Sequence, residues 1–303
     1  MDFYTSVSKD ANDIVVRGYK NGQRIRERIK DYQPTIFVKD NSGTSKWRTH
    51  LGECVAPLKV GNTQQLNKWK EKYKDVDNFP IYGYERYAQQ WITENFPPEI
   101  EFDYSLFRTA FMDIEVSSEE GFPDPDSANY PVTAITIWLQ GKYYIWVSQP
   151  WENKKNLNAE FFLIEDEKAM LDDFINRWQQ LDIDIVTGWN VRFFDLPYLH
   201  NRIDKLWGSG SNRLWSPWNR AVMRETFGMT GKTQKYLDIL GIATLDYIEL
   251  YKKFTYTNQE SYRLDHIANV ELGTGKLSFE EYGSLHTLWK SDFQLYLDYN
   301  IQD

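Results

Sequence analysis

Cysteine is almost absent from this 303-residue chain, which contains only Cys54. One cysteine cannot form an intramolecular disulfide, and it is too few for a zinc site built on cysteine ligands. Proteins that do without disulfides are typical of reducing compartments. We therefore expect a cytoplasmic protein.

Long apolar runs and an excess of positive charge are also missing. No stretch approaches the roughly eighteen apolar residues that a membrane-spanning helix needs, and the N-terminus has no basic patch followed by an apolar run. We expect no membrane partner. The net charge of −9 argues against a protein that holds nucleic acid mainly through a basic surface. It leaves open a metal-dependent nuclease, because carboxylates that bind divalent cations are themselves acidic.

Aromatic side chains, by contrast, are abundant at 16% of the residues, which supplies ample material for packed cores. The tandem prolines Pro97 and Pro98 mark the best domain boundary, because consecutive prolines stop regular secondary structure. We expect a small α+β domain over residues 1–102 and a second domain over residues 103–303.

The second domain is predicted to alternate between strands and helices, with a turn-rich β-hairpin inserted around residues 217–246. Its predicted elements are, in order, strands over 106–117, 131–140 and 142–149, a helix over 165–181, a strand over 183–190, and helices over 193–206, 243–254 and 261–272. Several strands followed by a helix and a further buried strand are typical of an α/β (α+β) nuclease core.

Two carboxylates in "TAFMDIEVS" are the first candidates for a site. Asp113 and Glu115 are two residues apart on a predicted strand, so both side chains point to one face. Adjacent carboxylates repel, and a shared metal ion would relieve the repulsion; the alternative is a solvent-facing acidic strand edge. Asp195 begins a helix just past the carboxyl end of a strand, a usual position for ligand groups, although it also suits a helix N-cap.

The last residues, "LDYNIQD", contain a second pair with helical spacing. Tyr299 and Asp303 are four apart and share a face next to a buried apolar stripe. The alternative is a solvated chain end that frays. Because the sequence stops at Asp303, we expect this helix end to be frayed or displaced.

Taken in order, "DIE", "NVRFFD" and "YNIQD" resemble the three exonuclease motifs of family B DNA polymerases, in the DEDD superfamily. "GFPDP", "TGWN", "LDYIELYKKF" and "GKL" extend the resemblance to the polymerases of T4-like bacteriophages. The resemblance implies a ribonuclease H-like core, with a mixed sheet flanked by helices, and 3′→5′ proofreading on single-stranded DNA. It also implies two Mg²⁺ or Mn²⁺ ions held by four carboxylates. These are Asp113, Glu115, Asp195 and Asp303.

The same resemblance implies roles for other residues. Tyr299 places the chain in the tyrosine subgroup and would orient the attacking water, because a tyrosine hydroxyl ordinarily keeps its proton at pH 7. Phe122 would wedge among the terminal bases, and the hairpin would separate strands. The DNA-contacting residues implied are Phe122, Trp189, Asn190, Phe194 and Lys276. One departure is Phe193, where related polymerases usually have glycine.

The sequence contains no polymerase motif, so we expect the polymerase portion to be a separate chain or a missing C-terminal part. Two alternatives to a DNA exonuclease stay open. One is a catalytically weak docking module that binds a polymerase subunit, or RNA through residues 1–102. The other is a stand-alone DEDD ribonuclease. If the chain is phage-encoded, its compartment is the host cytoplasm.

Overall fold

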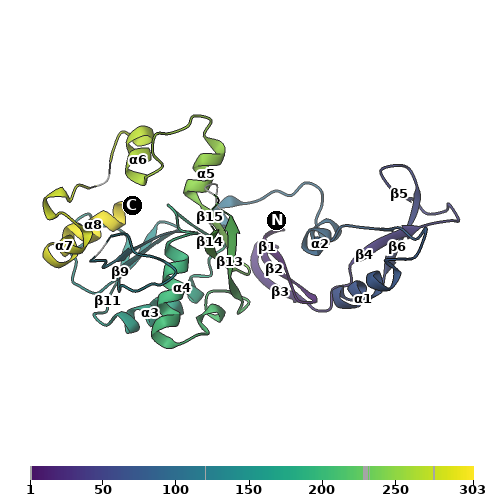
Figure 1. Cartoon of the computed structure of the whole chain (residues 1–303), viewed down its shortest axis with the longest axis horizontal. Helices are drawn as coiled ribbons and strands as arrows, with labels where there is room; N and C mark the ends of the chain where they lie inside the picture. The colour runs from purple at the N-terminus through teal and green to yellow at the C-terminus, as the bar shows by residue number, and fades with distance from the viewer. Residues whose placement is uncertain (1, 120, 228–230, 232, 276) are drawn as a thin grey trace. The chain divides into compact units, whose positions relative to one another are not determined.

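The computed structural model describes residues 2–119, 121–227, 231, 233–275 and 277–303. Two compact units divide the chain, Met1–Ser105 and Leu106–Asp303 (Figure 1). The division between them falls three residues beyond the boundary that the tandem prolines predict. Each unit has its own core.

The smaller unit contains two antiparallel sheets and two helices. A three-stranded sheet has the order β1-β2-β3, and a four-stranded sheet has the order β5-β6-β4-β7. Its elements are β1 (Phe3–Asp10), β2 (Asp13–Lys20), β3 (Gln23–Ile29), β4 (Thr35–Lys39), β5 (Trp47–Arg48), β6 (Cys54–Lys59), α1 (Thr63–Tyr73), β7 (Ile81–Tyr82) and α2 (Tyr87–Asn95). Asn62 and Gln65 form a capping box that starts α1. The buried side chains Ile14, Ile36 and Leu66 join these elements into one core.

The larger unit is built on a six-stranded mixed sheet with the order β11-β10-β9-β8-β12-β15. β8, β9 and β10 pair antiparallel, whereas β11 is parallel to β10 and both β12 and β15 continue parallel to β8. These strands are β8 (Thr109–Val116), β9 (Val132–Leu139), β10 (Lys142–Val147), β11 (Ala159–Leu163), β12 (Ile185–Gly188) and β15 (Ala243–Asp246). The edge strands β11 and β15 were not predicted as strands from the sequence.

One face of this sheet packs on α3 (Glu167–Leu181) and α4 (Asp195–Trp207). Apolar residues three or four apart on α3, such as Met170, Phe174 and Trp178, are almost completely buried against the sheet. Asp166 starts this helix by accepting the backbone N–H of Ala169 at 2.8 Å. This layer forms the larger of the unit's two cores.

The other face is covered by α7 (Leu285–Ser291) and α8 (Phe293–Gln302). Leu288, Phe293 and Leu297 pack there against Ala134 and Ile145 of the sheet. Figure 1 shows these two helices in yellow at the C-terminal end of the chain. The structure therefore confirms the predicted α/β class, with a mixed sheet flanked by helices.

A hairpin precedes the edge strand β15 in the chain. β13 (Ala221–Phe227) and β14 (Thr233–Ile239) pair antiparallel as the predicted hairpin, whose turn residues 228–230 and 232 lie outside the described residues. The hairpin is shorter than the predicted range 217–246, because Ala243–Asp246 pairs with β12 instead. α5 (Tyr247–Phe254) and α6 (Leu264–Leu272) follow, with short 3₁₀ turns at Tyr104–Leu106, Ser211–Arg213 and Glu280–Tyr282. Within the described part of the chain, no helix combines the length and apolar character needed to cross a membrane.

Candidate active site

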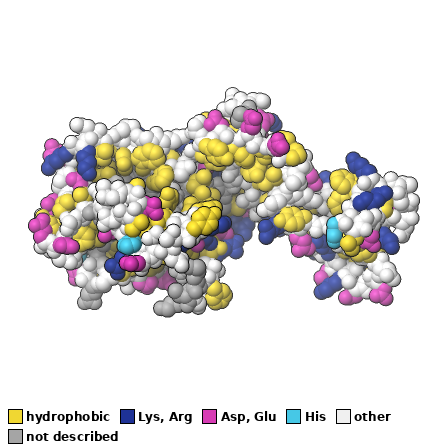
Figure 2. Space-filling model, turned by 90° about the horizontal axis from the view of Figure 1, so that it is seen from above, with side chains coloured by type: hydrophobic (Ala, Val, Ile, Leu, Met, Phe, Trp, Pro, Cys, Tyr) yellow, Lys and Arg dark blue, Asp and Glu magenta, His cyan; other side chains and the backbone are white. Residues whose placement is uncertain are grey.

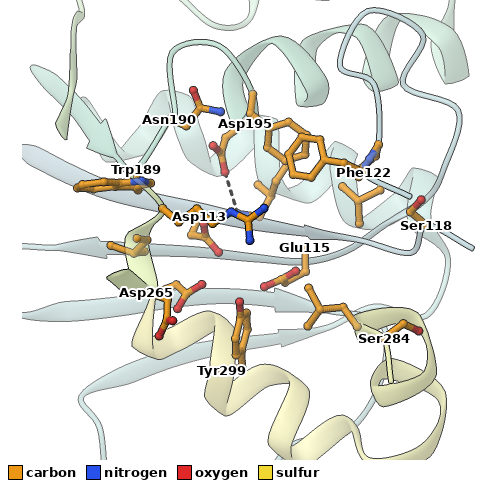
Figure 3. A pocket seen from close by; sticks show the side chains of 18 of the residues that line it. Asp113, Glu115, Ser118, Phe122, Trp189, Asn190, Asp195, Asp265, Ser284 and Tyr299 are labelled. Carbon is orange, nitrogen blue, oxygen red and sulfur yellow. Dashed lines mark hydrogen bonds between the residues drawn. The ribbon is translucent and has the colours of Figure 1, made fainter. Parts of the chain in front are cut away.

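The site begins with the alternation of side chains along β8. Met112, Ile114 and Val116 point into the core beneath α3 and α4. Asp113 and Glu115 therefore point to the opposite face, toward α8, as Figure 3 shows. Glu115 is only 7% exposed. Two carboxylates are thus held side by side in a setting with little water to screen them.

A third carboxylate reaches this pair from the end of α8. One oxygen each of Asp113, Glu115 and Asp303 lie within 4.8 Å of one another. The N–H of Asp303 donates to the carbonyl of Tyr299 at 3.1 Å, so the last turn stays helical. The helix end, expected from the sequence to be frayed or displaced, is therefore not displaced, and its fraying stays a prediction. Three oxygen donors at this spacing fit a hard divalent cation such as Mg²⁺ or Mn²⁺.

Asp195 is the fourth predicted carboxylate, and it lines the same cavity from the first turn of α4. It is 2% exposed, and its Oδ1 accepts the N–H of Ile114 at 3.1 Å (dashed line in Figure 3). Burial raises the pKa of Asp195 to about 7, and the charge of Asp246 acts in the same direction. Among the described residues it is not part of the three-carboxylate group. Its carboxyl group instead bonds to the backbone between Asp113 and Glu115.

The cavity around these acids has a volume of about 840 Å³. Tyr299 projects into it from α8 (Figure 3), and its ring meets that of Phe279 edge to face at 5.3 Å. Phe122 lines the cavity with 79% of its surface exposed, and its ring lies 4.8 Å from that of Phe194. Trp189 and Asn190 line it as well. Lys276 lies outside the described residues.

Aromatic surface continues outward from Trp189. Its ring lies 6.2 Å from that of Tyr247, the first residue of α5, which is half exposed. Phe254 at the other end of α5 is also largely exposed. Figure 2 shows apolar side chains grouped over the larger unit. Exposed rings of this kind offer stacking surfaces for unpaired bases.

The loop between β12 and α4 needs two special backbone positions. A Cβ on Gly188 would lie 2.4 Å from the carbonyl oxygen of Met112, so only glycine lets β12 pass this close beside Asp113. Asn190 has a φ of 69°, in the left-handed region that asparagine tolerates better than most residues. Both positions shape the turn that leads to Asp195.

Sequence reasoning missed a carboxylate that holds this loop. Asp246 is 1% exposed and accepts backbone N–H groups from Asn190 at 3.1 Å, Arg192 at 2.9 Å and Ile248 at 3.0 Å. It thus caps α5 and fixes the turn before Asp195 at the same time. An aspartate directly before "YIEL" is a recognisable N-cap signal, but its second set of partners is more than fifty residues away.

One further residue near the site was also missed. Arg263 lines the cavity and is the only arginine or lysine among the described lining residues. Six acidic side chains line the same cavity: Asp113, Glu115, Glu119, Asp195, Asp265 and Asp303. A lone arginine ahead of a short helix gave no signal in the sequence.

Phe193, which stands where related polymerases usually have glycine, packs against the hairpin. Its ring meets that of Tyr236 on β14 edge to face at 6.5 Å, and the Arg192 guanidinium lies 4.3 Å from the centre of the same Tyr236 ring. Arg192 also pairs with Glu249 of α5 at 2.9 Å. The hairpin is therefore attached through side chains to the loop that carries Asp195.

Comparison with known proteins decides the family. Residues 85–267 match the sequence profile of the DNA polymerase family B exonuclease domain. The chain belongs to this family. The matched range of the family B exonuclease domain includes Asp113, Glu115 and Asp195 and ends before Tyr299 and Asp303.

Similar proteins include DNA polymerases of two bacteriophages and a herpesvirus. The chain is 30% identical over 330 residues to a DNA-directed DNA polymerase of Escherichia phage RB69, covering 100% of this chain and 36% of the relative. The polymerase of Enterobacteria phage T4 is 31% identical over 329 residues, with the same coverage. The DNA polymerase catalytic subunit of Saimiriine herpesvirus 2 is 26% identical, covering 89% of this chain and 25% of the relative.

These matches confirm the resemblance to T4-like phage polymerases, and the six-stranded mixed sheet agrees with the expected ribonuclease H-like fold. The family B exonuclease chain spans about a third of the length of the phage polymerases it matches. For this chain, the activity and partners of those longer proteins are therefore proposals.

Proposed function

We propose that this protein is a metal-dependent 3′→5′ exonuclease that removes nucleotides from single-stranded DNA ends, as the proofreading part of a phage-type family B polymerase. The observation that carries the proposal is the group of Asp113, Glu115 and Asp303, gathered at one cavity of a chain that belongs to the family B exonuclease family. Such a group would hold Mg²⁺ or Mn²⁺, with Asp195 as a fourth acid beside it.

The residues of the chain have distinct parts in this reaction. Two bound divalent ions would supply an activated water and stabilise charge on the leaving 3′-oxygen. Asp113, Glu115 and Asp303 would hold those ions. Tyr299 projects into the same cavity. Its hydroxyl would donate a hydrogen bond to the attacking water and orient it. The terminal phosphodiester would have to lie in line with that water.

The preference for single strands is proposed from the cavity walls. Phe122, Phe194 and Trp189 offer ring faces to unstacked bases, and stacking on aromatic rings is worth about 1–3 kcal/mol per base. Paired bases are already stacked and would have to unpair first. Asn190 adds an amide for hydrogen bonding, and Lys276 stays a predicted phosphate contact.

The test is degradation of a 3′-labelled DNA oligonucleotide with Mg²⁺. We expect Asp113→Ala/Glu115→Ala to lower the rate by more than about 100-fold, in the range found when charge-stabilising groups are removed from active sites. The matched control is Glu165→Ala/Asp172→Ala, which makes the same change in charge at two exposed acids on and beside α3. Equal rates for the two double variants would refute the proposal.

Matched RNA and DNA oligonucleotides in the same assay decide the substrate. A faster rate on DNA supports the proofreading function, whereas a faster rate on RNA favours a stand-alone ribonuclease of the same superfamily. Single-stranded and fully paired ends compared side by side test the proposed single-strand preference.

A second candidate function concerns the smaller unit and RNA. A cavity of about 300 Å³ there is lined by Phe37, Trp47 and Tyr82 together with Arg48 and His50. Exposed aromatic and basic side chains in one cavity suit an unpaired base and its phosphate. Trp47→Ala in the full chain should weaken binding of a labelled single-stranded RNA without changing the exonuclease rate. Unchanged RNA binding would remove this candidate.

The proposal also gives the hairpin a role and names a partner protein. The hairpin of β13 and β14 would keep the two strands of a melted primer end apart, and Phe227 near its turn is 83% exposed. The polymerase portion would act on the same DNA, either on a separate chain or in a longer form of this one. Both proteins would work in the host cytoplasm, where a phage replicates its DNA.

A further inference from the structure

Asn300 is the residue between the two proposed functional positions of α8. It follows Tyr299 directly and is 1% exposed. Its Nδ2 donates to Oδ2 of Asp113 at 2.5 Å, and its Oδ1 accepts the hydroxyl of Thr136 at 2.5 Å. A buried amide therefore joins a proposed metal ligand to the neighbouring strand.

The orientation of this amide follows from its partners. An Asp113 carboxylate that binds a metal ion is ionised and can only accept hydrogen bonds, so the NH₂ group of Asn300 faces it. The carbonyl group of Asn300 then faces Thr136, whose hydroxyl donates. Thr136 of β9 stands directly opposite Asp113 of β8 in the strand pairing. Asn300 thus contacts both members of one cross-strand pair.

One helical turn earlier, Tyr296 also forms a buried hydrogen bond to β9, but its partner is Thr133. Its hydroxyl lies 2.5 Å from that of Thr133, which donates to the backbone carbonyl of Glu115 at 3.2 Å. Burial raises the pKa of Tyr296 well above its ordinary value, and the charges of Glu115 and Asp113 add to this effect. The phenol therefore keeps its proton as a donor. Tyr296 attaches α8 to the sheet through the hydroxyl of Thr133.

The position of Asp113 needs such support because of its neighbours. Three carboxylates with oxygens within 4.8 Å repel one another when ionised. Rotation of any one side chain away from the others lowers this electrostatic repulsion. A hydrogen bond from an amide to a carboxylate opposes that rotation, and it is stronger than a bond between neutral groups. An oxygen that accepts one N–H retains a second lone pair for a metal ion.

We propose that Asn300 is a positioning residue that holds the Asp113 carboxylate in its metal-binding orientation before an ion arrives. This inference rests on the proposed metal-dependent function of the site. Asn300 acts through Asp113 and does not touch the substrate. Groups of this kind that orient a ligand typically change metal affinity about 10–100-fold when removed.

The test measures Mn²⁺ binding by titration calorimetry, so it does not depend on turnover. Asn300→Leu keeps a similar side-chain volume and removes the donor, and we expect Mn²⁺ affinity to fall at least about tenfold. Thr136→Val is nearly isosteric and removes only the bond that orients the amide. It should lower affinity by a smaller factor, and it keeps the inference testable if Asn300→Leu does not fold.

The control is Tyr296→Phe, which removes the other buried contact between α8 and the sheet. We expect it to lower the melting temperature but to leave Mn²⁺ affinity within about twofold of the wild type, since Asp113 keeps its donor. Crystal structures should show a rotated Asp113 carboxylate in Asn300→Leu and an unchanged one in Tyr296→Phe.

The outcomes separate this inference from the function on which it rests. If the wild type binds no Mn²⁺, both the metal site and the role of Asn300 are refuted. If the wild type binds Mn²⁺ and the two variants at Asn300 and Thr136 bind it equally well, only the role of Asn300 is refuted. The same holds if Tyr296→Phe weakens binding as much as Asn300→Leu, because helix docking alone would then explain the loss.

Discussion

The Asp246 carboxylate accepts the backbone N–H of Arg192 at 2.9 Å, which ties the start of α5 to the loop before Asp195. The loop and the cap are separated by more than fifty residues in sequence. Because the same carboxylate caps α5 through Ile248, one buried charge fixes two segments that border the cavity.

We predict that Asp246→Ala lowers both stability and exonuclease rate. Three backbone N–H groups lose their acceptor, and leaving buried donors unsatisfied costs about 1–3 kcal/mol of unfolding free energy for each group that water cannot reach. Urea denaturation measures the first effect and the labelled-oligonucleotide assay the second. The matched control is Asp166→Ala, which removes the cap of α3 away from the cavity. It should destabilise by about 1 kcal/mol and leave the rate of the folded protein unchanged; an equal loss of rate would contradict the prediction.

The raised pKa of Asp195 predicts how stability depends on pH in the absence of metal. Its pKa is about 7 in the folded protein against an ordinary value of 3.8. Between these values the folded state holds a proton that the unfolded state releases. The associated stability is therefore complete below about pH 4 and is lost as the pH rises through about 7.

We expect Asp195→Asn to flatten this dependence in EDTA, so that the variant gains stability relative to the wild type between pH 4 and pH 8. Chemical denaturation at several pH values measures the difference. Addition of Mg²⁺ should reduce the wild-type slope, because a nearby cation favours the charged carboxylate. Parallel curves for the two proteins would show that Asp195 ionises normally.

Arg263 is predicted to contact a phosphate of the bound strand. It is the only arginine or lysine among the described residues that line a cavity with six acidic side chains, so DNA entering there has few other cations to meet. We expect Arg263→Ala to raise KM about fivefold and to change kcat little. The slope of the logarithm of the binding constant against the logarithm of the salt concentration should fall in magnitude by about one. Arg213→Ala, at an exposed position away from the cavity, is the control of equal charge. A change in kcat with KM constant would assign Arg263 to catalysis instead.

Contact between the hairpin and the loop predicts a selective effect on paired ends. Tyr236→Leu removes the ring against which Phe193 and Arg192 pack. We expect the rate on a mismatched primer end to fall about twofold to tenfold, with the rate on single strands unchanged, because couplings between such elements are small. Val222→Ala on the facing strand β13 serves as the control. Equal effects on both substrates would indicate damage to the active site itself.

Much of the larger unit could be predicted from local patterns. Alternation along 109–116 predicted that Asp113 and Glu115 share one face, and helical spacing predicted that Tyr299 and Asp303 share another. The helices α3 and α4 follow from their apolar stripes. The edge strands β11 and β15 were missed because each is only four or five residues long, too short for its period to stand out.

The sequence by itself therefore determined the composition of the site, since residue type and periodicity are local properties of the chain. Only the tertiary structure decided which groups meet: Asn300 and Asp113 are 187 residues apart and share a hydrogen bond. Asp246 and Arg192 likewise meet because β12 and β15 lie side by side. Such partners are set by strand order and helix docking, which depend on how whole layers bury their apolar faces.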